Sequence, residues 1–507
     1  MHRLSIVLFL FLTINSQIKS QILPREGNIL NYRRIGFAFP QMQKATGYQI
    51  EIAAGNYYRE DSFKRNLIKT IDTKTTKIIG EVPSFGKQYT WRVIYITGLS
   101  KYKKGTFYHF STGIIPGVDS TVTRFRILKH AEEYKDSYVF LDANKALFDM
   151  SGRPVWYLPN PETIDKFVRD LKITRQGTIT YVIDDQGAYE INYNGDILWK
   201  GPDNGIVNGA ASEHYHHEFT KLKNGHYMVL GTEFVLFKVP TLQDTSIVVI
   251  SQSELPPGIV NANYRKAPMG TIIEYDRDGH VAWSWKSSKY FNGSDLFYRR
   301  GPDGGILIHT HENGFYFNEQ DSVIFICFRD INRIIKIKYP EGYVMNTFGN
   351  IYRQGVMEGH NSMFCSQHSF KNSSKGYDYV YNNNICNYPA LPQVIKLQEP
   401  ISGKDSLKKI WEYNCTIEGM LETKQDPSKF TSGGNVIELP DGSIFVSMST
   451  PYSKVFIVSE EKEILWSGLP EKWNQPENRW EPFPQYKASI ITNKEDLEYL
   501  IWNSEKK

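Results

Sequence analysis

The feature that most constrains this chain is a β unit that recurs from about residue 121 onward. In four stretches an apolar residue is followed six positions later by glycine, with alternating apolar residues on both sides, which is typical of two strands joined by a tight turn. The stretches begin at Leu171, Phe219, Phe370 and Val436, and their glycines are Gly177, Gly225, Gly376 and Gly442. The repetition predicts one supersecondary unit that is used many times.

A second recurring element closes each unit with a turn and a tryptophan. The pairs are Gly152 and Trp156, Gly195 and Trp199, Gly279 and Trp283, and Lys462 and Trp466, with weaker copies at 342–348 and 409–411. Six such units of about four strands predict an all-β fold, a six-bladed β-propeller over residues 121–507. We expect the tryptophans to pack between blades, and the long insertions 233–268 and 350–366 to lie as loops at the faces.

Residues 22–114 have a different organisation. Short alternating runs at 47–52, 77–80 and 89–95 are separated by Gly, Pro and Asn, and no helical period lies between them. This predicts a separate small β-sandwich that resembles fibronectin type III modules, with residues 110–113 in the last strand. The boundary to the propeller is expected at residues 115–120.

Residues 1–20 are typical of a secretory signal peptide, because Arg3 precedes an apolar run from Leu4 to Leu12 that is too short to span a bilayer. We therefore expect an exported protein, periplasmic or extracellular, without a membrane span. The net charge of +4 is small for 507 residues, so nucleic acid is a poor candidate partner. The 4 cysteines are too few to hold together a chain of this length, and their pairing stays open.

Histidines are concentrated in one part of the chain, since 9 of the 12 lie between His214 and His368. His217, His311 and His368 each precede a β stretch. In a propeller the innermost strands line the central channel, so we expect these three to meet from consecutive blades. A single such histidine is more often a buried hydrogen-bonding residue, but three in register favour an active site. Arg329 interrupts an apolar strand, and a buried guanidinium is costly unless it meets an anion.

Together these motifs resemble the arylsulfate sulfotransferases over residues 130–490. The matching motifs are His-His-Glu at 216–218, His-x-Asn at 311–313 followed by the strand with Arg329, Gln-His at 367–368, and Tyr-Lys-Ala at 486–488, similar to the family's Tyr-Arg-Ala. Ser369 stands where the family usually has Asp, and Asn382-Asn383 stand where it has Asp-Asn.

The resemblance implies an exported enzyme that moves a sulfuryl group from an aryl sulfate donor to a phenolic acceptor. It implies a ping-pong route through a sulfohistidine at His368, without a cofactor or a metal. By the same match His217, His311 and Arg329 are catalytic. His216, Asn313 and Asn383 are then expected to bind substrate, and a homodimer is compatible with the sequence.

The residue types suit this chemistry, because sulfuryl transfer through a loose transition state depends on positioning and cationic donors. A neutral imidazole at His368 can attack an anionic ester without charge repulsion. Arg329 offers a planar fork of donors to the sulfuryl oxygens, and His311 or His217 can protonate the departing phenoxide.

Two other function classes stay open. The histidines could bind a divalent metal in a lyase that acts on acidic sugars, although the neighbouring Arg329 argues against a metal ion. Alternatively, the missing carboxylates at Ser369 and Asn382 fit a non-catalytic propeller that binds its partners through the channel.

Overall fold

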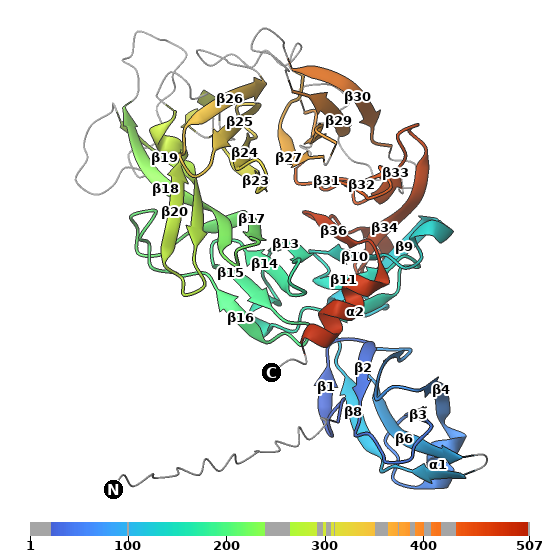
Figure 1. Cartoon of the computed structure of the whole chain (residues 1–507). Coiled ribbons are helices and arrows are strands. Elements are labelled where there is room, and N and C mark those ends of the chain that lie inside the picture. The colour runs from blue at the N-terminus through green and yellow to red at the C-terminus, as the bar shows by residue number, and fades with distance from the viewer. Residues whose placement is uncertain are drawn as a thin grey trace, which may run out of the picture. The chain divides into compact units, whose positions relative to one another are not determined.

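The computed structural model describes residues 22–98, 101–238, 264–291, 298–300, 306–308, 310–349, 363–373, 375–385, 391–399, 407–416 and 432–504 (Figure 1). The chain divides into two compact units, residues 1–113 and 114–507, and the expected boundary at 115–120 lies directly after this division. The predicted signal peptide falls outside the described residues. Among the described residues, no helix has both the length and the apolar character needed to cross a bilayer.

The first unit is a β-sandwich, as predicted. Its larger sheet has the strand order β1-β8-β6-β3-β4, with β7 paired to β6, and β2 and β5 form the second sheet. Buried aromatic rings fill its core, and the centroids of Phe37 and Trp91 are 5.1 Å apart. The elements are β1 (Asn28–Leu30), β2 (Arg34–Ala38), β3 (Gly47–Ala54), α1 (Glu60–Arg65), β4 (Leu67–Thr73), β5 (Lys77–Glu81), β6 (Gln88–Gly98), β7 (Lys101–Lys104) and β8 (Tyr108–Thr112).

The second unit is a six-bladed β-propeller, and Figure 1 shows its sheets arranged in a ring. Blade 1 contains β36 (Ala488–Ile491), β10 (Tyr138–Leu141), β11 (Ala146–Asp149) and β12 (Pro154–Tyr157). Blade 2 contains β13 (Val168–Ile173), β14 (Ile179–Ile183), β15 (Gly187–Ile191) and β16 (Ile197–Lys200). Blade 3 contains β17 (Tyr215–Lys221), β18 (Tyr227–Lys238), β19 (Tyr264–Tyr275) and β20 (Val281–Lys286).

The other three blades follow the same plan. Blade 4 contains β23 (Glu312–Asn318), β24 (Val323–Phe328), β25 (Arg333–Lys338) and β26 (Val344–Gly349). Blade 5 contains β27 (Gln367–Asn372), β28 (Asp378–Asn382), β29 (Gln393–Gln398) and β30 (Lys408–Asn414). Blade 6 contains β31 (Asn435–Glu438), β32 (Ile444–Ser447), β33 (Val455–Val458) and β34 (Ile464–Asn474), extended by β35 (Arg479–Pro482) and β9 (Thr123–Lys129). The unit also contains the hairpin β21 (Tyr298–Arg300) and β22 (Ile306–Ile308), the helix α2 (Lys494–Asn503) and short 3-10 turns.

The two ends of the propeller sequence close the ring. The late strand β36 pairs with the early strand β10, from Tyr138 opposite Ile491 to Leu141 opposite Ala488. The early strand β9 pairs in turn with β34 of blade 6. Pairing of segments more than 300 residues apart therefore joins blade 1 to blade 6, and the internal repeats alone did not predict which strands make this closure.

The tryptophans join neighbouring blades, which confirms their predicted packing role. In four blades the indole N–H donates to a backbone carbonyl in the outer turn of a neighbouring blade, so the recurring Trp and the recurring turn form one hydrogen-bonded contact. The pairs are Trp156 to Tyr193 (2.7 Å), Trp283 to Pro340 (2.7 Å), Trp411 to Glu460 (2.7 Å) and Trp466 to Met150 (3.0 Å).

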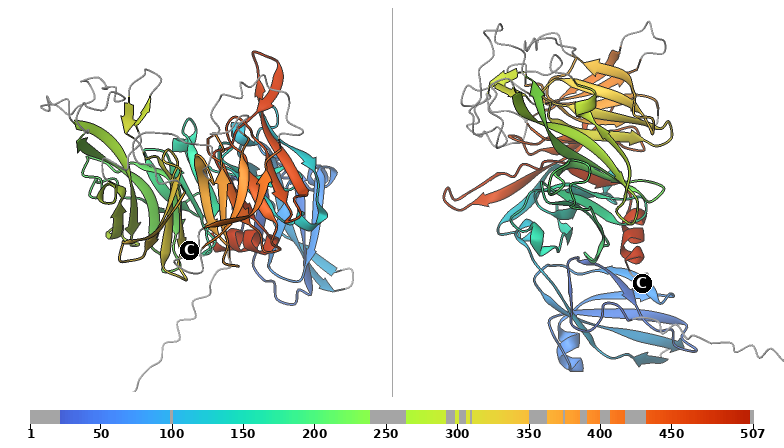
Figure 2. Two further views of the ribbon diagram at one scale, coloured as in Figure 1. Left: turned by 90° about the horizontal axis from the view of Figure 1, so that it is seen from above. Right: turned by 90° about the vertical axis from the view of Figure 1, so that its left-hand side faces the viewer.

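Two expectations need correction or fall outside the structure. Residues 233–238 and 264–268 are not loop, because β18 and β19 continue as one long hairpin in which Lys238 pairs with Tyr264 (Figure 2). The middle of that insertion, 239–263, and residues 350–362 lie outside the described residues.

Of the cysteines, Cys327 and Cys415 are free and buried, while Cys365 is disulfide-bonded.

Candidate functional site

The six innermost strands bring the predicted histidines together. Strands β36, β13, β17, β23, β27 and β31 are neighbours around the ring. Near the start of β17, β23 and β27 the pairing with the next strand shifts register, and His217 and His311 have the positive φ values 62° and 55°. Such bulges redirect side chains, and non-glycine residues at positive φ are concentrated at functional sites. The local backbone thus aims these imidazoles away from the regular strand faces.

A cavity of about 580 Å³ lies at these strand starts. His217, His311, His368 and Arg329 all line it, as predicted. It also has an apolar wall that includes Phe167, Phe483 and Pro484. Its other lining residues are Asp142, Ala143, Lys145, Asp165, Lys166, Val168, Arg169, Ser432, Gly433, Ser449, Thr450 and Tyr486.

His368 is buried, and its two ring nitrogens have different roles. Nδ1 lies 2.9 Å from the carbonyl oxygen of Gly434, which can only accept, so Nδ1 carries the proton. Nε2 therefore has a lone pair, and it accepts a close hydrogen bond from the hydroxyl of Tyr486. Burial, with the charge of Lys487, lowers the pKa of His368 well below its usual value, so the ring is neutral near pH 7.

The backbone next to His368 requires glycine. Gly434 has a φ of +88°, and a Cβ at this position would lie 2.2 Å from the ring of Tyr381. Any side chain here would displace the carbonyl that holds His368.

His217 and His311 complete the imidazole cluster. The ring centroid of His217 is 5.7 Å from that of His311 and 6.0 Å from that of His368. Nδ1 of His217 contacts Nδ1 of His216 at 2.7 Å. Burial, together with His216 and Arg169, lowers the pKa of His217 well below its usual value. His217 and His368 therefore present neutral imidazoles to the cavity, which an anionic ester can approach.

Arg329 lies in the turn that follows β24 and does not interrupt the strand, which corrects the sequence-based expectation. Its backbone N–H donates to the carbonyl of His311 at 2.9 Å, and Nη1 donates to Asp330 at 3.1 Å. Within the described part of the chain, its buried Nε has no hydrogen-bond partner. Arg329 therefore lines the same cavity as the histidines and has one unused donor.

Arg169 is a cavity residue that our sequence reasoning missed. It lies in β13, its guanidinium is 3.8 Å from the ring centroid of Tyr486, and it pairs with Asp184. The repeat contained a signal for it. Two positions before the first apolar residue of the repeat stand Arg169, His217 and His368, so the same register that selected the histidines also points to Arg169.

Three predicted substrate-binding residues do not line the cavity. Asn313 is buried and donates to the carbonyl of Gln367 at 2.9 Å. Asn383 is also buried and donates to the carbonyls of Ser366 (3.0 Å) and Gly433 (3.3 Å). The Nδ2 group of each amide thus bonds the backbone of a neighbouring blade, and His216 contacts His217.

An ion cluster lies beneath the cavity. Lys487 Nζ donates to the carboxylate of Glu218 (2.5 Å) and to the carbonyl of His217 (3.1 Å). Burial alone would raise the pKa of Glu218, but Lys371, Lys487 and Lys172 together lower it below its usual value. The cluster stays ionised and supports the backbone of His217.

Asp142 holds the segment that carries Tyr486. Its two carboxylate oxygens accept from the backbone N–H groups of Tyr486 (2.9 Å) and Lys487 (2.8 Å). Burial raises the pKa of Asp142 to about 7, although these hydrogen bonds oppose the shift.

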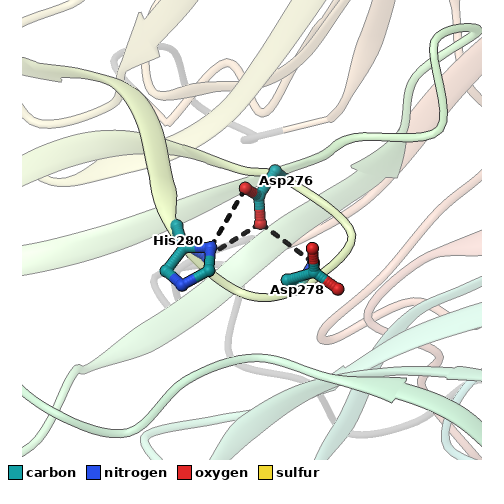
Figure 3. Close-up of side chains that lie close together, drawn as sticks. All are labelled: Asp276, Asp278 and His280. Atoms are coloured by element: carbon teal, nitrogen blue, oxygen red, sulfur yellow. Dashed lines mark hydrogen bonds and ion pairs between the residues drawn. The ribbon is translucent and has the colours of Figure 1, made fainter.

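A separate group of potential metal ligands, Asp276, Asp278 and His280, lies on the turn between β19 and β20 (Figure 3). One oxygen of Asp276 accepts from the backbone N–H groups of Asp278 and His280, both at 2.9 Å. Asp149 caps the corresponding turn of blade 1 in the same way. Turn capping accounts for this exposed group, and we assign it no ligand.

Comparison with known proteins shows no close relative. No family model matches the chain, and no curated protein matches it. The chain is similar to a protein of unknown function from Bacteroides caccae, with 12% identity over 73% of this chain and 99% of that one, and a TM-score of 0.39. It is also similar to AztD from Citrobacter koseri (9%, 88% and 98%, TM-score 0.30) and to an auxiliary nutrient binding protein from Bacteroides thetaiotaomicron (8%, 94% and 94%, TM-score 0.32). At these values the likenesses carry no functional argument.

Proposed function

We propose that this protein is an aryl sulfate sulfotransferase that transfers the sulfuryl group through His368. The observation that carries the proposal is the state of His368. Its Nδ1 proton is engaged by Gly434, its neutral Nε2 accepts from the hydroxyl of Tyr486, and the ring lines a cavity that also contains Arg169 and Arg329. A desolvated neutral imidazole beside cationic donors is the arrangement that nucleophilic attack on an anionic ester needs.

The charge balance of the cavity favours a sulfate ester over a phosphate ester. Arg329 already pairs with Asp330, and Arg169 pairs with Asp184. The two guanidiniums therefore offer donors without a large excess of positive charge. That suits a monoanionic sulfate ester better than a dianionic phosphate ester, which would also meet these carboxylates.

In the proposed first step, Nε2 of His368 attacks the sulfur while the bond from sulfur to the phenolic oxygen breaks. The electron pair leaves on that oxygen, and Arg329 with the neighbouring imidazoles donates to the sulfuryl oxygens. In the second step an acceptor phenol attacks the same sulfur, the pair returns to Nε2, and the proton lost by this phenol balances the one that the departing phenoxide takes up. The apolar wall at Phe167 and Phe483 is available to the aromatic rings of both substrates.

We also propose that the protein is exported, because residues 1–20 are typical of a secretory signal peptide.

The test is direct detection of the sulfo-enzyme. Incubation with 4-nitrophenyl sulfate and no acceptor should release one equivalent of nitrophenol and add one sulfo group to the peptide that contains His368. His368→Asn should lose the adduct and turnover. His280→Asn changes an exposed turn histidine and should keep both.

Several results would contradict the proposal. A sulfo group on another residue, or full turnover by His368→Asn, would reassign the nucleophile. Hydrolysis of 4-nitrophenyl phosphate in preference to the sulfate would reverse the charge argument. One equivalent of a bound divalent metal by elemental analysis, with loss of activity on its removal, would favour the metal-dependent lyase instead.

A further inference from the structure

The hydroxyl of Tyr486 occupies the lone pair that the proposed reaction uses. Because Nδ1 of His368 is the donor to Gly434, Nε2 can only accept, and the phenol must be the donor in this contact. Attack on sulfur requires Nε2 to give up this hydrogen bond. The hydroxyl of Tyr486 is then available as a donor close to the bond that breaks between sulfur and the donor oxygen.

Tyr486 is held firmly in this position. Its ring stacks under the guanidinium of Arg169 at 3.8 Å, and its centroid is 4.7 Å from that of His368 and 5.5 Å from that of His217. Its backbone N–H is bound by Asp142. A ring packed on three sides keeps its hydroxyl within reach of the reaction centre, which is the first requirement for proton transfer.

We propose that Tyr486, and not His217, carries the proton between the two half-reactions. This inference rests on the proposed function and extends it. As the bond from sulfur to the donor oxygen breaks, Tyr486 gives its proton to that oxygen and becomes a phenolate next to Arg169. When the acceptor phenol attacks the sulfur, the phenolate takes the acceptor's proton, and both Tyr486 and His368 return to their starting states.

The surroundings favour Tyr486 over His217 for this task. Burial keeps His217 neutral, and the N–H of a neutral imidazole is a much weaker acid than a phenol. Burial raises the pKa of Tyr486 to about 12, but Arg169, Lys487 and Arg329 each act to lower it. The same cations would stabilise the transient phenolate.

The test uses the acidity of the leaving phenol. In Tyr486→Phe, kcat/KM for phenyl sulfate should fall on the order of a hundredfold or more, because its poor leaving group needs a proton. With 4-nitrophenyl sulfate, whose leaving group needs little help, the loss should be less than about tenfold, and the sulfo adduct on His368 should still form. Tyr189→Phe changes another buried tyrosine, outside the cavity, and should leave kcat/KM for both substrates unchanged.

If Tyr486 had only a structural role, its loss would lower kcat/KM for both substrates by the same factor. Equal losses in Tyr486→Phe would therefore overturn the inference. A second measurement needs no variant. The wild-type rate should depend only weakly on the acidity of the leaving phenol, and a steep dependence would refute proton donation.

The two proposals fail in different ways. If the wild type neither forms the His368 adduct nor turns over aryl sulfates, the proposed function falls and this inference falls with it. If the wild type forms the adduct but Tyr486→Phe shows no selective loss, only the role of Tyr486 is wrong.

Discussion

Two cavities of similar size lie at opposite ends of the same inner strands, and they differ in almost everything else. The one at the strand starts has a volume of about 580 Å³, and the one at the hairpin turns about 660 Å³. The first contains buried His368 and Arg329. The second is lined by exposed lysines and acids such as Lys223, Lys375 and Asp321.

The backbone explains part of this difference. At the hairpin turns the polar side chains satisfy local N–H groups, as Asn318 does for Gln320 and Asp321, and Ser373 does for Lys375. These are ordinary turn contacts. At the strand starts, bulges and positive φ values direct side chains into the cavity instead.

The protonation of the cavity side chains explains the rest of the difference between the two cavities. Burial shifts the pKa values of His217, His368 and Tyr486 at the first cavity. Perturbed groups that converge in a cavity are a better guide to chemistry than cavity volume or polarity. The ion cluster of Glu218 connects the two cavities, because its partner Lys371 lines the second cavity and its partner Lys487 directly follows Tyr486 of the first.

The largest effect is expected at the first cavity. Arg329→Lys keeps the charge but loses the planar fork, so turnover of 4-nitrophenyl sulfate should fall on the order of a hundredfold. Arg277→Lys, on the exposed turn between β19 and β20, is the matched control and should change turnover little. Steady-state kinetics decide the point, and full activity in Arg329→Lys would remove this residue from the mechanism.

The second effect, on stability rather than turnover, is expected at the ion cluster around Glu218. Lys487→Met removes one cation from buried Glu218 and the donor to the carbonyl of His217, and should lower the free energy of unfolding by about 3 kcal/mol. Lys375→Met, at the exposed cavity, should change it by less than about 0.5 kcal/mol. Denaturant unfolding measures both, and equal effects would show that the ion cluster does not matter to the fold.

The smallest effect concerns pH. The folded pKa of His368 lies well below the unfolded value of about 6.5, so below that pH the unfolded chain binds more protons and stability falls. Between pH 7.5 and 5.5 the wild type should lose about 1 kcal/mol more than His368→Asn, which lacks this group. The raised pKa of Asp142 makes a contribution of opposite sign to the pH dependence of stability. This contribution is common to the wild type and the variant, so it cancels in their difference. His280→Asn should follow the wild-type curve, and parallel curves for all three proteins would mean that His368 titrates normally.

The sequence by itself determined the architecture of the propeller. Strand alternation, the glycine six positions after the first apolar residue, and the recurring tryptophan are local patterns; four of the six blades have the glycine and five have the tryptophan. The same register placed His217 and His368 near strand starts, and His311 directly precedes β23. Local patterns suffice here because a blade folds from neighbouring strands and needs only its turns and its apolar positions to be specified.

Only the tertiary structure decided how the cavity residues act on one another. Tyr486 meets His368 across 118 positions of sequence, and it does so because β36 returns to pair with β10 and closes the ring. The same closure stacks Arg169 on Tyr486. Asn313 and Asn383 look like ligand-binding residues in the sequence, but packing of adjacent inner strands directs their amides to backbone carbonyls. These contacts depend on distances between blades, which no local pattern encodes.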